Sequence, residues 1–218
     1  EIIEVDIKYI YVHGQRRNAY LITMLDVFTR KALVWTLNWD MKTNRVIELL
    51  NQLLDQCLIP LNIDPKQVRL KIRTDNGSQF VARMFRDHLG EIGIENEYIQ
   101  PATPQQNGHI EAFHSTLTKL VCNKYELESL AKTRQILERF FHVYNNKRIM
   151  KAILYKSPND FYREWKNGNI ETRKINGKTK HFFRERVPEN QASPCSETLY
   201  RHNKLNKQQN QNLTLSRN

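Results

Sequence analysis

Three segments of β type precede the first segment of α type, and this order constrains the fold more than any other feature. Apolar and charged residues alternate over residues 3–12 with a period of two, which predicts a strand with two different faces. Residues 18–25 and 32–37 are rich in aromatic, β-branched and aliphatic side chains, and His13-Gly14-Gln15 forms a turn after the first segment. We therefore expect an antiparallel meander of three strands.

Helical spacing begins at residue 43 and then alternates with short strands. Apolar residues recur at intervals of three and four over residues 43–58, and Pro60 helps to end that helix. The next expected elements are a strand, a helix stopped by Gly93, a strand, an irregular loop with two prolines and two further helices. Their ranges are 68–72, 80–92, 94–99, 100–108, about 108–124 and about 127–144. This order predicts an α/β domain with a mixed five-stranded sheet flanked by helices, covering residues 1–165.

The composition changes after residue 165. Residues 170–175 and 178–183 flank Asn176-Gly177, which predicts a β-hairpin with a type I′ turn. The hairpin is rich in Lys and Arg, so we expect residues 166–188 to form a small basic module. Asn and Gln make up 10 of the 30 residues from 189 to 218, and few large apolar residues accompany them. That composition predicts a disordered C-terminal tail.

The charge of the chain points to a polyanionic partner. Its 218 residues include 34 Lys and Arg against 23 Asp and Glu, which gives a net charge of +11. Residues 166–218 contain 11 basic and 4 acidic residues, or +7, which leaves 23 minus 19, or +4, for residues 1–165. Such an excess favours binding to nucleic acid. The plainer alternative is a solubilising tail on a nearly neutral domain.

Several function classes are excluded by the sequence. No run approaches the roughly 18 to 20 consecutive apolar residues of a membrane span, and the first residues lack a basic segment before an apolar one. Cys57, Cys122 and Cys195 are far apart and odd in number, which argues against a disulfide framework or a CxxC zinc site and suits a reducing cytoplasm. Neither a GxxxxGK loop nor a GxSxG elbow is present, which argues against an NTPase or a serine hydrolase.

Three carboxylates fall where such a fold would bring them together. Asp6 lies in the first expected strand, Asp75 at the end of the fourth and Glu111 one turn into a helix. Taken singly, each could be a solvated charge, a turn residue or a helix cap. The flanking residues decide between these interpretations: VDIKYI at 5–10, TDNGSQF at 74–80 and PQQNGHIE at 104–111. With these motifs the chain resembles the DDE transposase and retroviral integrase catalytic core.

The resemblance covers about residues 3–165 and is closest in kind to the integrase-type transposases of bacterial insertion sequences. It implies a ribonuclease-H-like fold, a cytoplasmic, nucleoid-associated location in bacteria and two Mg²⁺ ions, with Mn²⁺ as a possible substitute. By the family's pattern Asp6, Asp75 and Glu111 would be both the catalytic residues and the metal ligands. Hard Mg²⁺ prefers oxygen ligands, and two such ions can serve the attacking and leaving oxygens of a phosphoryl transfer.

Residues near Glu111 are candidates for DNA contact. Ser115 and Thr118 stand at +4 and +7 from Glu111, on the same face of an ideal helix. Thr118 occupies a position where relatives commonly have Lys or Arg, and the family's usual Arg-Pro-His is replaced here by Arg148-Ile149-Met150. The polar loop before the helix is expected to order on DNA. The DNA-binding candidates are Gln105, Gln106, Asn107, His114, Ser115, Thr118 and Lys119.

The function implied by the resemblance is cleavage of element ends and transfer of the 3′ hydroxyl to a target phosphodiester. A metal-dependent nuclease that does not join strands and an inactive DNA-binding relic remain alternatives. The expected partner is DNA, bound by a homo-oligomer. Asp6 lies so near the first residue that we also expect an upstream module for recognising element ends. Asp26 is left out of the triad because it ends the second expected strand before a turn.

Overall fold

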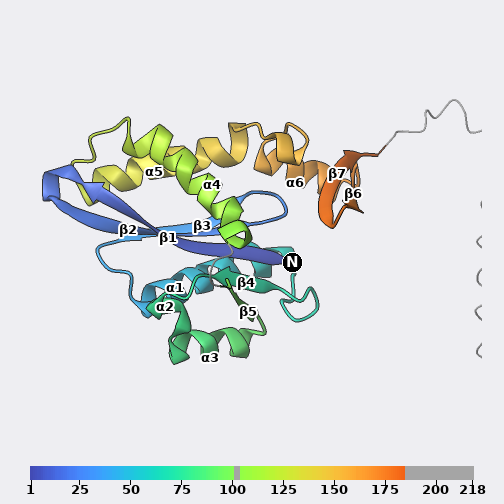
Figure 1. The fold of residues 1–218 in the computed structure, drawn as a ribbon, viewed down its shortest axis with the longest axis horizontal. Helices are drawn as coiled ribbons and strands as arrows, with labels where there is room; N and C mark the ends of the chain where they lie inside the picture. The colour runs from blue at the N-terminus through green and yellow to red at the C-terminus, as the bar shows by residue number, and fades with distance from the viewer. Residues whose placement is uncertain (101–103, 185–218) are drawn as a thin grey trace, which may run out of the picture.

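The computed structural model describes residues 1–100 and 104–184, and five strands form its central sheet. The strand order is β3-β2-β1-β4-β5 (Figure 1). The first three strands pair antiparallel, whereas β4 pairs parallel with β1 and with β5. Their bounds are β1 Ile2–Val12, β2 Arg17–Asp26, β3 Ala32–Asn38, β4 Lys71–Thr74 and β5 Glu95–Tyr98. The predicted meander and mixed five-stranded sheet are confirmed.

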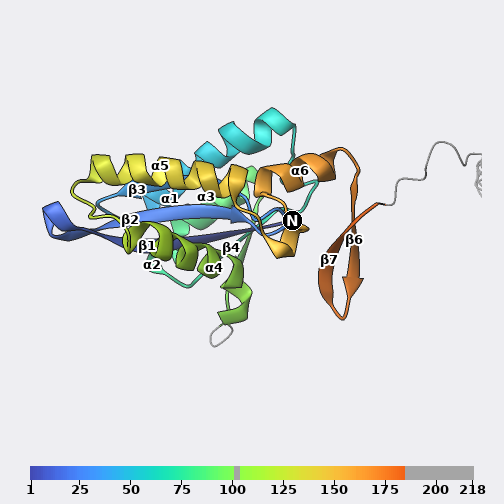
Figure 2. The ribbon, with the colours of Figure 1, turned by 90° about the horizontal axis from the view of Figure 1, so that it is seen from above.

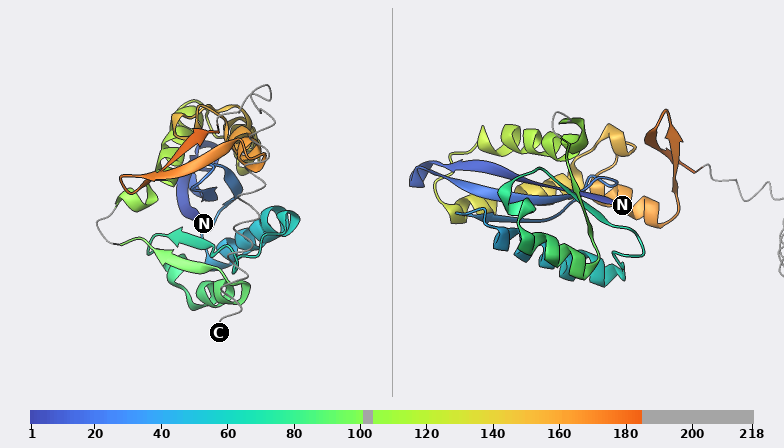
Figure 3. Two further views of the ribbon diagram at one scale, coloured as in Figure 1. Left: turned by 90° about the vertical axis from the view of Figure 1, so that its right-hand side faces the viewer. Right: turned by 60° about the horizontal axis from the view of Figure 1, so that its bottom comes forward.

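Helices cover both faces of this sheet (Figures 2 and 3). One face carries α1 (Thr43–Leu53), α2 (Ser78–Val81) and α3 (Arg83–Ile92), and the other carries α4 (Gly108–Leu117) and α5 (Leu130–Lys147). Helix α1 runs on through a π-helical turn (Leu54–Leu58) and a 3₁₀ turn (Ile59–Leu61), and α4 runs on through a π-helical turn (Thr118–Cys122). The remaining elements are α6 (Pro158–Lys166), β6 (Ile170–Ile175), β7 (Lys178–Phe183) and 3₁₀ turns at His13–Gln15, Pro104–Asn107 and Lys151–Ile153.

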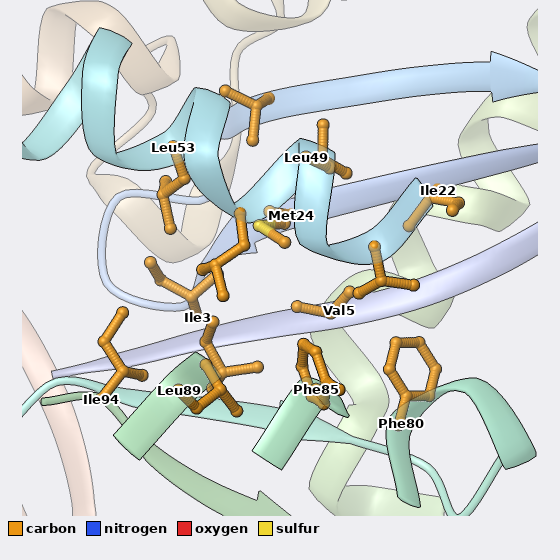
Figure 4. Close-up of a cluster of buried hydrophobic side chains, with 14 of the residues drawn as sticks. Ile3, Val5, Ile22, Met24, Leu49, Leu53, Phe80, Phe85, Leu89 and Ile94 are labelled. Atoms are coloured by element: carbon orange, nitrogen blue, oxygen red, sulfur yellow. The ribbon is translucent and has the colours of Figure 1, made fainter. Parts of the chain in front are cut away.

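The alternation within β1 builds two cores. Ile3 and Val5 are buried in a cluster beneath α1 and α3, with Leu49, Phe85 and other apolar side chains (Figure 4). Residues at even positions of β1 point to the opposite face because successive strand residues alternate. Among them Ile10 and Val12 join a second cluster under α4 and α5. Glu4 and Asp6 lie on that same face, nearer the start of the strand.

Aromatic contacts attach the C-terminal hairpin to the main domain. The Phe28 ring, after β2, lies 5.5 Å from Phe161 of α6 and 5.1 Å from His181 of β7, measured between ring centroids. Ile170 of β6 is buried with Phe161 in a third apolar cluster. The turn between β6 and β7 has φ of 52° at Asn176 and 73° at Gly177, as a type I′ turn requires. The predicted hairpin is therefore confirmed, with the expected strand bounds.

Three sequence predictions of element boundaries are wrong. The strand expected at 68–72 is β4 at Lys71–Thr74, because turns occupy residues 65–69 and Arg69 adopts a φ of 49°. The helix expected at 80–92 is divided into α2 and α3 by Ala82, whose ψ of 136° is extended.

The third boundary concerns the helix expected from residue 127. It begins at Leu130 because the Ser129 side chain accepts the Lys132 amide and caps the helix. The predicted tail at residues 189–218 lies outside the described residues. Within the described ranges no helix combines the length and the apolar character that crossing a membrane requires.

Gly14 makes a close approach that a larger residue would prevent. The turn after β1 docks on the segment before α5, where His13 donates its amide to Leu127 at 2.7 Å. A Cβ on Gly14 would lie 2.2 Å from the carbonyl oxygen of Glu128. We expect Gly14→Ala to lower the free energy of unfolding by about 1–3 kcal/mol, as overpacking does. Urea unfolding of the purified chain measures this change.

Gly90 provides the matched control. A Cβ there would meet nothing within 4 Å, and the residue lies inside α3. Gly90→Ala should raise the free energy of unfolding by about 0.5–1 kcal/mol because alanine favours the helix. Equal effects of the two substitutions would contradict the docking of the turn.

The pH dependence of hairpin attachment provides a second prediction. Burial between aromatic rings, helped by the charge of Arg30, lowers the pKa of His181 below its ordinary value of 6.5. The folded state then binds fewer protons than the unfolded state, so His181 contributes stability above pH 6.5 that is lost as the pH falls below it. His181→Phe should keep the ring contacts and remove the pH-dependent contribution of His181 to the free energy of unfolding. Comparing urea midpoints of both proteins at pH 7.5 and 5.5 tests it, and equal pH dependence would contradict it.

Candidate active site

Asp6 is held in place on β1 by two contacts. Its Oδ1 accepts the Ile7 amide at 2.8 Å, and its Oδ2 lies 3.2 Å from Nδ1 of His114 on α4. The Asp6 side chain retains 24% exposure, whereas that of His114 retains 10%. Asp6 is therefore oriented from within the protein and still reaches its surface.

Asp75 lies directly after β4, where that strand leaves the sheet. The parallel register pairs Glu4 of β1 with Arg73 of β4, and Asp6 and Asp75 each follow two residues later in the chain. The Asp75 side chain is exposed, and its Oδ1 accepts the Gly77 amide at 2.9 Å. The turn at residues 75–77 thus sets the orientation of this carboxylate.

Glu111 lies in the first turn of α4 and is exposed. The amide of the preceding residue, Ile110, donates to Oε2 of Glu4 on β1 at 2.8 Å. The structure therefore places Glu111 beside the strand that carries Asp6.

The three predicted acids come from three elements that meet at β1. Asp75 and Glu111 are both exposed, and Asp6 is partly so. Among the residues that the structure describes, no group of three or more His, Cys, Asp or Glu side chains is arranged to hold a metal ion. The backbone thus brings the predicted positions to one region, and the side chains do not form a closed cluster there.

Glu4 is a residue of this region that the sequence analysis did not single out. Its side chain is fully buried, with Oε1 2.8 Å from Nδ1 of His109 and 3.6 Å from Nη1 of Arg73. The available signal was its position two residues before Asp6, on the same face of the strand. The alternation gave no indication that α4 would cover it.

Arg73 contacts the buried carboxylate, and Arg30 interacts with it electrostatically. Arg73 also binds Glu97 of β5, with Nη2 2.9 Å from Oε1, and donates from Nη1 to the carbonyl of Gln106 at 2.8 Å. Burial lowers the pKa of Arg30, and the charges of Glu4 and Asp26 oppose that shift. A buried carboxylate requires such compensation.

Asp26 has a structural role in the turn after β2. Its carboxylate accepts the amides of Phe28 and Thr29 at 3.2 and 3.0 Å and the hydroxyl of Thr29. These bonds occupy the side chain within its own turn, which agrees with leaving Asp26 out of the triad.

The residues predicted to contact DNA from α4 have different surroundings. Ser115 and Lys119 are exposed, whereas the Thr118 hydroxyl donates to the backbone carbonyl of His114 at 2.8 Å. His114 itself is buried against Asp6, so the structure gives it an intramolecular partner. A DNA contact for each of these residues stays a prediction.

The loop residues before α4 are only partly described. Asn107 is buried, and the Gln106 side chain accepts the Gln100 amide at 3.0 Å. The side chain of Gln105 lies outside the described part. A role for these residues in DNA binding also stays a prediction.

Comparison with known proteins agrees with this arrangement. Two family profiles, both described as integrase core domain, match residues 1–104 and 92–158. Together the two profiles cover residues 1–158, and the chain belongs to the integrase core family that both describe. One relative, the transposase for insertion sequence element IS904 of Lactococcus lactis, is 27% identical over 152 residues. That match covers 69% of this chain and 57% of the relative, so the chain spans little more than half of that transposase.

Solved structures with the same fold are retroviral integrases. The integrase of the simian T-cell lymphotropic virus intasome, in complex with the PP2A regulatory subunit B56 gamma, aligns with a TM-score of 0.58 at 16% identity, covering 74% of this chain and 54% of that one. The HTLV-2 integrase catalytic core domain in complex with magnesium aligns with a TM-score of 0.55 at 17% identity, covering 74% and 95%. The predicted ribonuclease-H-like fold is confirmed.

Proposed function

We propose that the chain is the catalytic core of a DNA strand-transferase that cleaves the ends of a mobile element and joins them to target DNA. The observation that carries the proposal is that β1, which carries Asp6, pairs with β4, which Asp75 follows, and is hydrogen-bonded to the start of α4, which carries Glu111. Membership of the integrase core family supports it. Because the chain spans only part of its relative, the activity of the whole protein belongs to this proposal as well.

The donor atoms fit divalent magnesium. All three acids offer carboxylate oxygens, which are the ligands that hard Mg²⁺ prefers, and Mn²⁺ accepts similar ligands. The HTLV-2 integrase core is described in complex with magnesium, which supports the same ion here. When bound, two Mg²⁺ ions would activate the attacking oxygen and stabilise the leaving oxygen of an in-line displacement.

The protein's own residues contribute orientation. The Ile7 amide and His114 orient the Asp6 carboxylate, and the Gly77 amide orients that of Asp75. Because both carboxylates are oriented in advance, less conformational entropy is lost when a ligand binds. Water first displaces the 3′ oxygen at the element end. The freed 3′ hydroxyl then attacks a target phosphodiester and displaces the 3′ oxygen of the target strand, with no covalent bond to the enzyme.

DNA binding is proposed to use α4 and the hairpin. Ser115 and Lys119 are exposed on or just beyond the helix that carries Glu111. Arg173, Lys174 and Lys180 are exposed on β6 and β7, where cations can contact phosphates. The retroviral relative is part of an intasome, which supports assembly of several copies on DNA.

The catalytic prediction concerns Asp75→Asn and Glu111→Gln. Each substitution removes one anionic ligand and keeps the side-chain shape. The rates of nicking and joining of labelled DNA in Mg²⁺ or Mn²⁺ should therefore fall by more than about 100-fold. A loss of that size exceeds the usual effect of replacing a residue that only supports a metal ligand. Joined products separate a transferase from a nuclease that only cleaves. Mn²⁺ binding, followed by the electron paramagnetic resonance of free Mn²⁺, should weaken in the same variants.

Exposed acids on α3 serve as matched controls. Asp87→Asn and Glu91→Gln change the same residue types on the opposite face of the sheet and should retain activity and Mn²⁺ binding. Equal activity or equal Mn²⁺ affinity in all four variants would refute the proposed site. An inactive chain with Mn²⁺ binding that depends on Asp75 and Glu111 would support the metal site and reject strand transfer by this chain alone.

The hairpin prediction concerns salt dependence. Replacing Arg173, Lys174 and Lys180 together by Ala should reduce the slope of log K against log salt for duplex DNA by up to about 2.7, because each phosphate contact contributes about 0.9. Fluorescence anisotropy over a range of salt concentrations measures it. A control that replaces Arg83 and Arg86 of α3 removes exposed cations elsewhere. An unchanged slope in the triple variant would exclude the hairpin as a phosphate-binding element.

A further inference from the structure

Glu4 makes the contacts of a helix cap, although it belongs to a strand. Helix α4 begins at Gly108, and the side chain of its N-cap residue, Asn107, makes no capping hydrogen bond. Glu4 supplies the missing acceptor, since its Oε2 accepts the Ile110 amide at 2.8 Å. A carboxylate is also electrostatically favourable at the N-terminal end of a helix. The start of α4 is therefore tied to β1 by a side chain from that strand.

The second oxygen of Glu4 extends the connection to the other elements. Oε1 lies 2.8 Å from His109, the second residue of α4, and 3.6 Å from Arg73 of β4. Arg73 in turn donates to the Gln106 carbonyl, just before α4. One network, with the fully buried Glu4 at its centre, thus joins β1, β4 and the start of α4.

This network lies next to each predicted acid in the chain. Glu4 stands two residues before Asp6, and Arg73 two residues before Asp75. His109 and Ile110 come directly before Glu111. Fixing the relative positions of the network therefore fixes the relative positions of the three backbone segments that carry the acids.

We propose that Glu4 is a positioning residue that sets Glu111 against Asp6 and Asp75 for divalent metal binding. The inference rests on the proposed function. Glu4 is fully buried beneath α4 and contacts no solvent, so it acts through the helix. The rival interpretation is a buried ion pair that stabilises the fold and leaves the metal site unaffected.

The experiment measures Mn²⁺ affinity by electron paramagnetic resonance, at a temperature where each variant is fully folded. Glu4→Ala should weaken binding by about 10- to 100-fold, the usual cost of losing a residue that orients a metal ligand. Glu4→Gln keeps an oxygen acceptor for the Ile110 amide and should recover part of that loss. It also serves as the test variant if Glu4→Ala does not fold.

Two controls separate positioning from stability. Leu89→Ala, in the core on the opposite face of the sheet, destabilises the fold and should leave Mn²⁺ affinity unchanged. Added to Glu111→Gln, Glu4→Ala should weaken binding no further, because its effect passes through Glu111. Unaltered affinity in both Glu4 variants, or a full additional loss in the double variant, would overturn the inference.

A readout without metal tests the same contact. Hydrogen exchange of the peptide that contains residues 109–111 should be faster in Glu4→Ala than in Leu89→Ala, because the Ile110 amide loses its acceptor. Failure of the proposed function has a different signature. In that case Asp75→Asn and Glu111→Gln would leave Mn²⁺ binding unchanged in a chain that retains Glu4. That result would refute both the proposed function and this inference.

Discussion

The whole arrangement depends on β1, because it is the central strand and both of its faces are covered. It pairs antiparallel with β2 on one side and parallel with β4 on the other, so its register fixes every other strand. Ile3, Val5 and Ile7 pack in the core under α1 and α3, whereas Ile10 and Val12, on the other face, pack under α4 and α5. A shift of one residue would exchange these faces and place Asp6 in an apolar core. The position of the site is therefore set by strand pairing.

The face of β1 toward α4 changes character along its length. Ile10 and Val12 are packed in an apolar cluster with Phe113 of α4, whereas Glu4 and Asp6 carry charge. One helix thus covers an apolar half and a charged half of the same strand. The apolar half holds the helix down, and at the charged half His114 and the helix start contact carboxylates of β1. The charged residues and the apolar packing residues on this face therefore occupy different parts of β1.

Much of the fold could be predicted because its elements carry strong local signals. The period of two in β1 and the Asn176-Gly177 turn gave strands whose bounds agree with the structure. The errors arose where backbone conformation decides, at Arg69 with its positive φ and at Ala82, whose extended backbone divides a helix. Arginine does not by itself indicate a positive φ, and alanine does not by itself indicate an extended backbone. Apolar spacing alone could not reveal either break.

The site could be predicted only as far as its motifs extend. Asp6, Asp75 and Glu111 were predicted from flanking residues, and in the structure Asp6 lies in β1, Asp75 directly after β4 and Glu111 in the first turn of α4. The burial of Glu4 was not predictable, because it depends on a helix that begins more than 100 residues later, at Gly108. A charged residue in an alternating strand is predicted to be solvent-exposed unless the helix that covers it is known. The burial of His114 against Asp6 depends on the same contact between α4 and β1.

The distance in sequence between Glu4 and its partners has a consequence for how the chain is made. As synthesis proceeds, the three-stranded meander is complete at residue 38, while the parallel edge of β1 stays unpaired until β4 has formed. Until α4 has been added, the carboxylate of Glu4 lacks the partners that make its burial tolerable. The nascent meander is then an open sheet with an unpaired edge, a form prone to non-native association. The buried carboxylate of the first strand thus depends on partners that are synthesised more than 100 residues later.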